Sequence, residues 1–166
     1  MGVTSEEGIG STFWFELPAV AALDAALDRA QDALQAAAGK RVLVAEDNEV
    51  NQLLARRILE RLGCEVVLAV NGLEAVQRAC SERFDLVLMD CQMPELDGLG
   101  ATRAIRQWER REGRAPLSII AVTASAFAED VSRCLAAGMD AVLTKPFKPA
   151  QLAAYVQGPA AVLKAS

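Results

Sequence analysis

Histidine is absent from the 166 residues of this chain. That absence excludes histidine general bases, histidine metal ligands and any phosphohistidine carried by the chain itself. Basic residues are also in short supply, with 17 Lys and Arg against 22 Asp and Glu, so the net charge is −5. This acidic balance makes nucleic acid an unexpected partner. Long apolar runs are missing too, so we expect no membrane contact by this fragment and a cytoplasmic location.

Cysteine is scarce and scattered. The chain has four cysteines: Cys64, Cys80, Cys91 and Cys134. They lie far apart in the sequence, without the paired spacing of a metal site. We therefore predict reduced thiols of a cytosolic protein that mostly fill the core.

The N-terminal segment contains one recognisable strand. Residues 1–10 are polar and glycine-containing, whereas residues 11–17 are rich in aromatics and predict a strand that Pro18 ends. No partner strand is apparent nearby. The run GIGSTFWFELP, residues 8–18, resembles the end of the ATPase domain of a sensor histidine kinase. Residues 1–18 are then a C-terminal remnant of that domain, and because its other nucleotide-binding boxes are missing, we expect no ATP binding.

The next segment is rich in alanine and predicts a linker over residues 19–39. Its apolar residues alternate at spacings of three and four along one helical seam, formed by Val20, Leu23, Leu27, Ala30 and Leu34. Gly39 ends the helix. Two interpretations are open: a linker helix that lies against its surroundings, or a coiled coil through residues 20–38 that dimerises the parent protein.

From residue 40 onward, strands alternate with helices. Strands are predicted over 41–45, 65–70, 84–89, 117–122 and 141–144, and helices over 48–62, 72–82, 97–112, 127–137 and from 149. Five βα units indicate an α/β fold with a parallel sheet. Right-handed crossovers in a chain this short fit a doubly wound, flavodoxin-like order 2-1-3-4-5. The glycine–proline pair at 158–159 interrupts or ends the last helix, and residues 158–166 are predicted to be a tail.

Two of these helices carry informative faces. In helix 48–62 the apolar residues share one face and the charged residues lie largely opposite; the apolar set is Val50, Leu53, Leu54, Ile58 and Leu62. We expect that apolar face to be the packed one. Helix 97–112 is basic through Arg103, Arg106, Arg110 and Arg111. A solvated face is the expected meaning, and docking of an acidic partner is the alternative.

Three carboxylates follow the first and third strands. The first strand ends in Glu46 and Asp47, and the third, an unbroken apolar run, ends in Asp90. The order 2-1-3-4-5 places these ends side by side at the topological switch point. Like charges a few ångströms apart are costly unless a cation intervenes, so the pattern predicts Mg²⁺, with Mn²⁺ as a substitute. In the alternative, Asp47 caps the following helix and Asp90 only hydrogen-bonds its own turn.

A hydroxyl and an ammonium group are predicted at the same edge. Thr123 ends the fourth strand and Lys145 follows the fifth. Beside a bound metal they could hold the oxygens of an anion, Thr123 as a hydrogen-bond donor and Lys145 as a point charge. The separate alternatives are a strand-end threonine and a surface lysine. The Lys145–Pro146 bond is a candidate for the cis form, which would re-aim the lysine.

These residues, in this order and spacing, resemble the receiver domain of response regulators. The matching motifs are VAEDNEVN at 44–51, MDCQMPELDG at 89–98, TA at 123–124, AGMD at 137–140 and TKPF at 144–147. The resemblance covers residues 40–157 and is closest to the receivers of bacterial hybrid sensor histidine kinases. An ATPase-domain tail, a linker and then a receiver is the order of segments in those kinases.

The resemblance implies a role for each site residue. Asp90 is the implied phosphoacceptor, and Thr123 and Lys145 hold the phosphoryl oxygens. Asp47, Asp90 and the backbone carbonyl of Gln92 are the implied Mg²⁺ ligands, with Glu46 acting through water. The implied partners are the phosphodonor domain of a histidine kinase and a histidine phosphotransfer protein.

The chain departs from the family at Val142, where receivers commonly carry an aromatic residue three positions before the lysine. In the family that residue switches together with the threonine. Phosphorylation could still draw Thr123 inward, but no ring rotates to report it. We therefore expect an altered or weaker change on the face formed by the last two helices and the last strand.

Three functions remain open at this stage. The first is a phosphorelay receiver within a hybrid kinase that could be membrane-anchored, the fragment not being a kinase by itself. The second is an Mg²⁺-dependent aspartyl-phosphate phosphatase or phosphotransferase, a class that generally has a second acid where this chain has Gln92. The third is a receiver-like module that binds partners without being phosphorylated.

Overall fold

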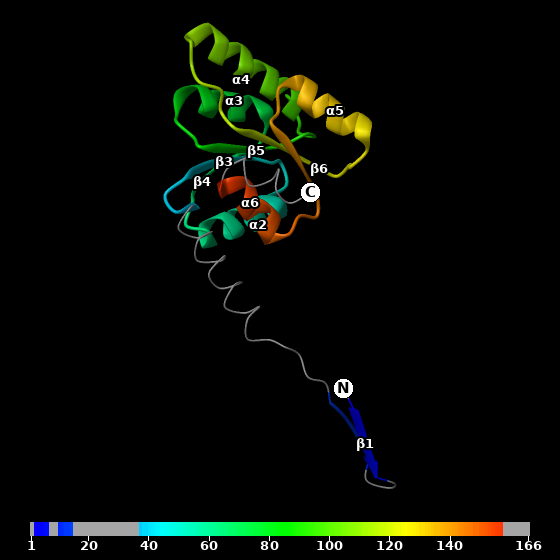
Figure 1. Cartoon of the computed structure of the whole chain (residues 1–166). Coiled ribbons are helices and arrows are strands. Elements are labelled where there is room, and N and C mark those ends of the chain that lie inside the picture. Colours follow the sequence, from blue (N-terminus) through cyan, green and yellow to red (C-terminus); the bar gives the residue numbers. More distant parts are fainter. Residues whose placement is uncertain (1, 7–9, 15–36, 158–166) are drawn as a thin grey trace. The chain divides into compact units, whose positions relative to one another are not determined.

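The computed structural model describes residues 2–6, 10–14 and 37–157 (Figure 1). The chain divides into two compact units, Met1–Asp32 and Ala33–Ser166. The predicted linker helix lies outside the described residues except for its last two positions, and so do the coiled-coil alternative and the tail at 158–166.

The first unit contains a pair of strands. Strand β1 (Gly2–Glu6) pairs with β2 (Gly10–Trp14) in antiparallel register, with Gly2 opposite Trp14. The expectation of a strand without a partner nearby was therefore wrong. The partner lies in the preceding polar residues, where Val3 and Thr4 are β-branched residues that favour a strand despite the composition around them. Residues 15–17 of the predicted strand lie outside the described part.

The second unit is built on one parallel sheet. Its strands are β3 (Arg41–Ala45), β4 (Glu65–Ala69), β5 (Leu86–Asp90), β6 (Ile119–Thr123) and β7 (Ala141–Thr144). They pair in the order β4-β3-β5-β6-β7, every pair parallel. This is the predicted order 2-1-3-4-5, and the fold prediction is confirmed.

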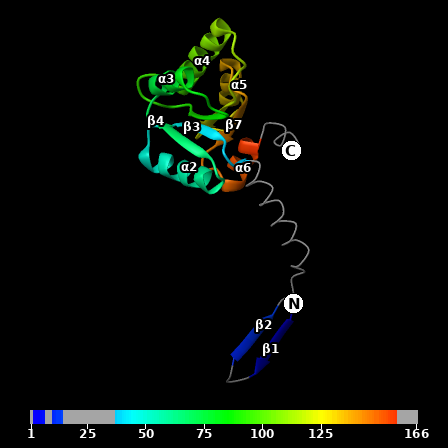
Figure 2. The same cartoon turned by 90° about the vertical axis from the view of Figure 1, so that its left-hand side faces the viewer.

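Five helices cover the two faces of this sheet. They are α2 (Glu49–Arg61), α3 (Gly72–Ser81), α4 (Gly98–Glu112), α5 (Ala128–Ala137) and α6 (Pro149–Gln157). Helices α2 and α6 lie on one face, and α3, α4 and α5 on the other (Figures 1 and 2). Strands β5 and β6 are buried at every residue, as expected for central strands covered on both faces. Among the helices of the described residues, we find none that could span a lipid bilayer.

The orientation of α2 differs from the prediction. Its apolar residues Val50, Leu53 and Leu54 are 73%, 51% and 51% exposed. The buried residues are instead Gln52, Ala55 and Leu59. The reason is local: the Gln52 side chain points inward and donates from Nε2 to the Glu46 carbonyl at 2.6 Å, and this fixes the rotation of the helix. The predicted stripe therefore splits, and only its C-terminal end, Ile58 and Leu62, packs against the core.

The basic helix α4 is solvated at three of its four arginines, but Arg106 is not. The Arg106 side chain is only 12% exposed and forms ion pairs with Glu109 at 2.9 Å and Asp140 at 3.0 Å. Its Nε also donates to the Gly138 carbonyl at 2.8 Å. The expectation of a fully solvated basic face was thus wrong at this position, because Arg106 joins α4 to the turn before β7.

One glycine determines how closely α4 approaches the end of β5. A Cβ added at Gly98, the first residue of α4, would collide with the backbone carbonyl of Asp90. We expect Gly98→Ala to lower the free energy of unfolding by about 2 kcal/mol, since neither backbone segment can move away cheaply. Gly100→Ala is the matched control, because its Cβ would meet chiefly the movable end of the Leu96 side chain. Equal losses for both variants in urea denaturation would contradict this explanation.

Candidate functional site

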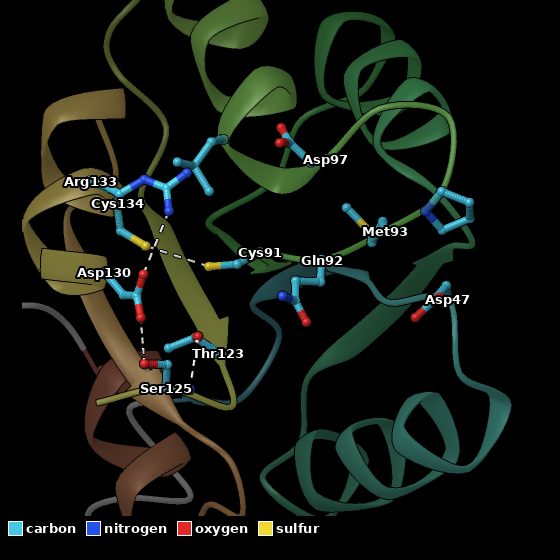
Figure 3. A pocket seen from close by; sticks show the side chains of 12 residues that line it. Asp47, Cys91, Gln92, Met93, Asp97, Thr123, Ser125, Asp130, Arg133 and Cys134 are labelled. Atoms are coloured by element: carbon cyan, nitrogen blue, oxygen red, sulfur yellow. Dashed lines mark hydrogen bonds and ion pairs between the residues drawn. The ribbon is translucent and has the colours of Figure 1, made fainter. Parts of the chain in front are cut away.

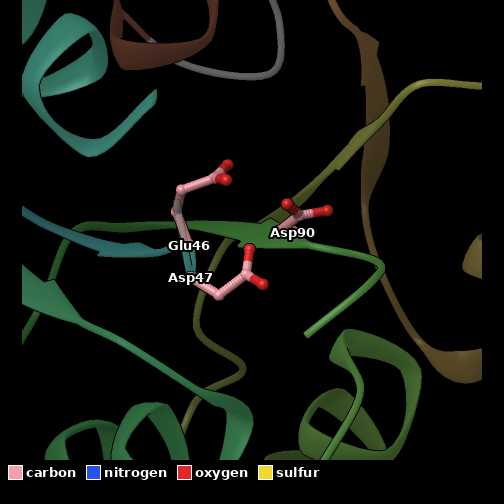
Figure 4. Close-up of side chains that lie close together, drawn as sticks. All are labelled: Glu46, Asp47 and Asp90. Carbon is pink, nitrogen blue, oxygen red and sulfur yellow. The ribbon is translucent and has the colours of Figure 1, made fainter. Parts of the chain in front are cut away.

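The ends of β3 and β5 bring three carboxylates together. Glu46 and Asp47 directly follow β3, and Asp90 is the last residue of the neighbouring strand β5. One carboxylate oxygen from each of the three lies within 4.8 Å of the others (Figure 4). The predicted juxtaposition at the switch point is therefore present.

The three acidic residues differ in their exposure and in their hydrogen bonds. Glu46 and Asp90 are buried, at 5% and 6% exposed, whereas Asp47 is exposed. Asp47 does not cap α2, because the Asn48 side chain occupies that position and accepts from two backbone amides of the helix. The capping alternative for Asp47 is thus wrong. Asp90 does accept from its own turn, through the Gln92 amide at 3.1 Å.

Lys145 is the cation among these carboxylates. Its Nζ lies 2.6 Å from Glu46 Oε2 and 2.6 Å from Asp90 Oδ2. The Lys145–Pro146 bond is cis, the form for which the sequence made it a candidate. One ammonium group therefore bridges the two buried carboxylates, and the cluster as a whole keeps an excess of negative charge.

Burial and the lysine act in opposite directions on these groups. Burial raises the pKa of Asp90, and hydrogen bonds from Lys145 and the Gln92 amide only partly offset it. Burial would also raise the pKa of Glu46, but hydrogen bonds from Lys145 and Asn51 outweigh it and leave that pKa lowered. For Lys145, burial favours the neutral amine, yet the bonds to Asp90 and Glu46 raise its pKa. The lysine is therefore charged, and of the two buried carboxylates Asp90 is the one whose pKa is raised.

Two residues that support Glu46 were missed as site residues. Asn51 Nδ2 donates to Glu46 Oε1 at 2.8 Å, and Gln52 Nε2 donates to the Glu46 backbone carbonyl. Both lie on the first turns of α2. Asn51 had a sequence signal, because it closes the motif at 44–51, whereas Gln52 had none beyond being a polar residue on an amphipathic helix.

Thr123 ends β6 beside an open cavity of about 630 Å³. The cavity is bounded by Asp47 and Gln92 on one side and by Ser125 and Asp130 on the other (Figure 3). Thr123 is buried, and its Oγ1 accepts from the Ser125 amide at 3.1 Å. The hydroxyl hydrogen is therefore available to a group in the cavity.

The four cysteines are free thiols, as predicted, but two of them are neighbours in space. Cys91 Sγ lies 3.4 Å from Cys134 Sγ, and both residues line the cavity beside Thr123. Burial, Cys134 and the negative charge of Asp90 raise the pKa of the Cys91 thiol to about 12. Sequence distance hid this contact, since the two residues are 43 positions apart.

The donor set suits a small hard cation. The clustered atoms are all carboxylate oxygens, and Lys145 pairs with only two of the three acids, Glu46 and Asp90. Oxygen-only ligands with few carboxylates are typical of Mg²⁺ rather than of zinc or copper. A cation at this position would relieve the repulsion that the residues alone leave uncompensated.

A doubly wound five-stranded sheet with clustered acids, a threonine and a lysine at its switch point is the architecture of the receiver class of signalling domains. Residues 42–157 match the response regulator receiver domain family, and the chain belongs to that family.

In sequence and structure, the chain is similar to the receiver domains of hybrid sensor kinases. Sensor protein GacS of Pseudomonas syringae pv. syringae is 48% identical over 116 residues, which are 70% of this chain and 13% of GacS. The receiver domain of sensor histidine kinase PA1611 from Pseudomonas aeruginosa PAO1, with magnesium coordinated in its active site cleft, is 45% identical at a TM-score of 0.66. That match covers 72% of this chain and 96% of the PA1611 domain.

A third relative is known in a complex. The receiver domain of Ssk1 from Saccharomyces cerevisiae, co-crystallised with the histidine phosphotransfer protein Ypd1, is 33% identical at a TM-score of 0.69, over 72% of this chain and 87% of that chain. The chain thus spans a small part of the curated relative GacS and most of each receiver structure.

Proposed function

We propose that this receiver accepts a phosphoryl group from a phosphohistidine onto Asp90 and passes it to a histidine phosphotransfer protein or to water. The observation that carries the proposal is the position of Asp90: its carboxylate is buried, 2.6 Å from Lys145 and within the acidic cluster, and its neighbours Cys91 and Gln92 line the cavity of about 630 Å³. A carboxylate held this way can act as a nucleophile, because neighbouring positive charge offsets the repulsion between the carboxylate and an approaching phosphate.

The proposed Mg²⁺ ligands are Asp47, Asp90 and the backbone carbonyl of Gln92, with Glu46 acting through water. When bound, the ion supplies the positive charge that lets one anion approach another and stabilises the in-line transition state. Asp47 suits this role because it is exposed and does not cap α2. Glu46 is already held by Lys145 and Asn51, which fits an indirect contact.

The remaining residues act on the transferred group. An oxygen of Asp90 bonds to phosphorus as the bond from phosphorus to the donor imidazole nitrogen breaks, and the donor imidazole takes up a proton. Lys145 then shifts its ammonium from the Asp90 oxygen to a phosphoryl oxygen, and Thr123 donates its hydroxyl hydrogen to another. The resulting acyl phosphate is labile, which suits a relay.

An exposed apolar surface on α2 supports the proposal that a helical protein partner binds this receiver. It consists of Val50, Leu53 and Leu54 on α2, at most eight residues from Glu46. Large apolar side chains of this exposure on one helix face are typical of a docking surface. We propose that the phosphodonor domain and the phosphotransfer protein dock here, which would bring their histidine over the cavity that Asp47 lines.

We further propose that the segment order is that of a hybrid kinase. Residues 1–18 would be the remnant of an ATPase domain, 19–39 a linker, 40–157 the receiver and 158–166 a tail. The two paired strands at the N-terminus support the first assignment, since the remnant would contribute strands to a larger sheet. The parent chain would be a hybrid histidine kinase, and this part of it cytoplasmic.

Acetyl phosphate with Mg²⁺ distinguishes the proposed receiver from its two alternatives. We expect intact mass to show one phosphoryl group per chain, lost over time, and no labelling when the metal is chelated. Sustained release of phosphate over many turnovers would instead indicate a phosphatase, which Gln92 at the second position after Asp90 disfavours. No labelling at all would indicate a module that only binds partners.

A further inference from the structure

Cys91 and Cys134 form a thiol pair beside the proposed phosphoacceptor. Their sulfur atoms lie 3.4 Å apart, and Figure 3 draws them facing each other across the wall of the cavity. Cys91 immediately follows Asp90, and Cys134 lies in the last half of α5. The pair therefore connects the segment directly after Asp90, at the end of β5, to α5, the helix that follows Thr123.

Solvent reaches this pair through Cys91, because Cys134 is itself buried. Cys91 is half-buried and, with Cys134, lines the open cavity of about 630 Å³. Cys64 and Cys80, by contrast, have no described cysteine partner: Cys64 Sγ donates to the Ala37 carbonyl at 3.5 Å, and Cys80 lies on α3. Of the described residues, only Cys91 and Cys134 have sulfurs in contact.

We propose that Cys91 and Cys134 are a redox modification site, which oxidants of the peroxide class convert to a disulfide. With hydrogen peroxide, one thiol gives up its proton and its sulfur attacks a peroxide oxygen, so the O–O bond breaks, a sulfenic acid forms, and the released hydroxide takes up that proton and leaves as water. The second thiol attacks that sulfur, the S–O bond breaks and a second water leaves. The sulfurs are oxidised by two electrons and the peroxide is reduced by two. A disulfide needs a sulfur separation of about 2.05 Å, so the pair must close by about 1.4 Å, within reach of side-chain rotation.

The disulfide would act on phosphorylation, and this part rests on the proposed function. Drawing Thr123 toward a phosphoryl group requires the segment between β6 and α5 to shift relative to Asp90. A covalent bond from Cys91 to α5 restrains that shift, because it ties both sides of the cavity together. We expect the oxidised protein to be labelled by acetyl phosphate several-fold more slowly than the reduced protein. In a reducing cytosol such a bond is transient, as sensing disulfides usually are.

The test is an oxidation time course on the full chain. The protein is incubated with hydrogen peroxide, free thiols are blocked with iodoacetamide under denaturing conditions, and peptides are mapped without reduction. We expect a Cys91–Cys134 cross-link to accumulate while Cys64 and Cys80 are recovered blocked. Linkage of Cys91 to Cys64 or Cys80, linkage between chains only, or oxidation of Cys91 beyond sulfenic acid without a cross-link would overturn the proposal.

The acetyl phosphate rate is then measured on the oxidised, reduced and re-reduced protein. Slower labelling that dithiothreitol restores supports the coupling, and an unchanged rate overturns it. Cys134→Ala is the variant expected to lose the sensitivity to peroxide, and Cys80→Ala the matched variant expected to keep it. If the reduced protein takes no phosphoryl group while the cross-link still forms, the proposed function fails and the thiol site stands.

Discussion

Asp90→Asn is expected to take up no phosphoryl group from acetyl phosphate, a loss of about 10³-fold or more relative to the unchanged chain. The amide keeps the shape of the side chain but is not a nucleophile. Asp130→Asn is the matched control, because Asp130 lines the cavity beside Thr123 and accepts a hydrogen bond from Ser125 without joining the acidic cluster. Intact mass spectrometry checks both variants. Labelling of Asp90→Asn at the normal rate would show that another residue is the acceptor.

The same substitution should also stabilise the fold in the absence of Mg²⁺. Burial raises the pKa of Asp90, so its charged form is disfavoured in the folded chain at neutral pH. Removing that charge leaves Lys145 paired one-to-one with Glu46. We expect a gain of about 1 kcal/mol in the free energy of unfolding at pH 7. The gain should shrink as the pH falls through the raised pKa, because the unchanged chain then neutralises Asp90 by protonation.

Lys145→Met is expected to have the largest effect on stability. It keeps the aliphatic stem but leaves Glu46 and Asp90 buried without their shared cation. Leaving buried charges unpaired costs about 2–4 kcal/mol at pH 7. Phosphoryl labelling should fall about 10-fold or more, since the oxygen-binding charge is lost. Lys148→Met is the control, because Lys148 is exposed and forms no ion pair among the described residues.

The pH dependence of Lys145→Met separates charge from packing. Without the lysine, the pKa values of both buried carboxylates lie above their unfolded values, so the folded variant binds more protons than the unfolded one. Its stability then rises as the pH falls, and Mg²⁺ should restore much of the loss at pH 7. In the unchanged chain Glu46 acts oppositely: its lowered pKa contributes stability that is lost as the pH falls through that pKa. If the loss in the free energy of unfolding is constant with pH and unaffected by Mg²⁺, it would come from lost packing and not from unpaired charge.

Strand order allowed most of the candidate site to be predicted from the sequence. Once five βα units were recognised, right-handed crossovers left two common arrangements, and the short chain favoured the order 2-1-3-4-5, in which Glu46, Asp47 and Asp90 meet. Those positions follow from backbone topology alone. The cis bond at Pro146 and the free cysteines likewise needed only local chemistry.

The errors arose where tertiary packing overrides local pattern. In α2 the apolar stripe suggested the buried face, but the hydrogen bond from Gln52 to Glu46 turns the helix so that Val50 is 73% exposed. In the sequence Arg106 looks like the exposed arginines beside it, but in the structure it contacts Gly138 and Asp140 in the turn before β7. The contact between Cys91 and Cys134 joins two elements that are distant in the sequence, and no periodicity signals such a pair.

A crystal structure of the chain with Mg²⁺ and beryllofluoride tests the central claim most directly, because that complex mimics the phosphorylated aspartate. We expect Asp47, Asp90 and the Gln92 carbonyl around the metal, beryllofluoride on Asp90, and both Lys145 and Thr123 bonded to its fluorides. A metal held elsewhere, or an Asp90 carboxylate that stays paired with Lys145 and carries no beryllofluoride, would contradict the assignment of Asp90 as the phosphoacceptor.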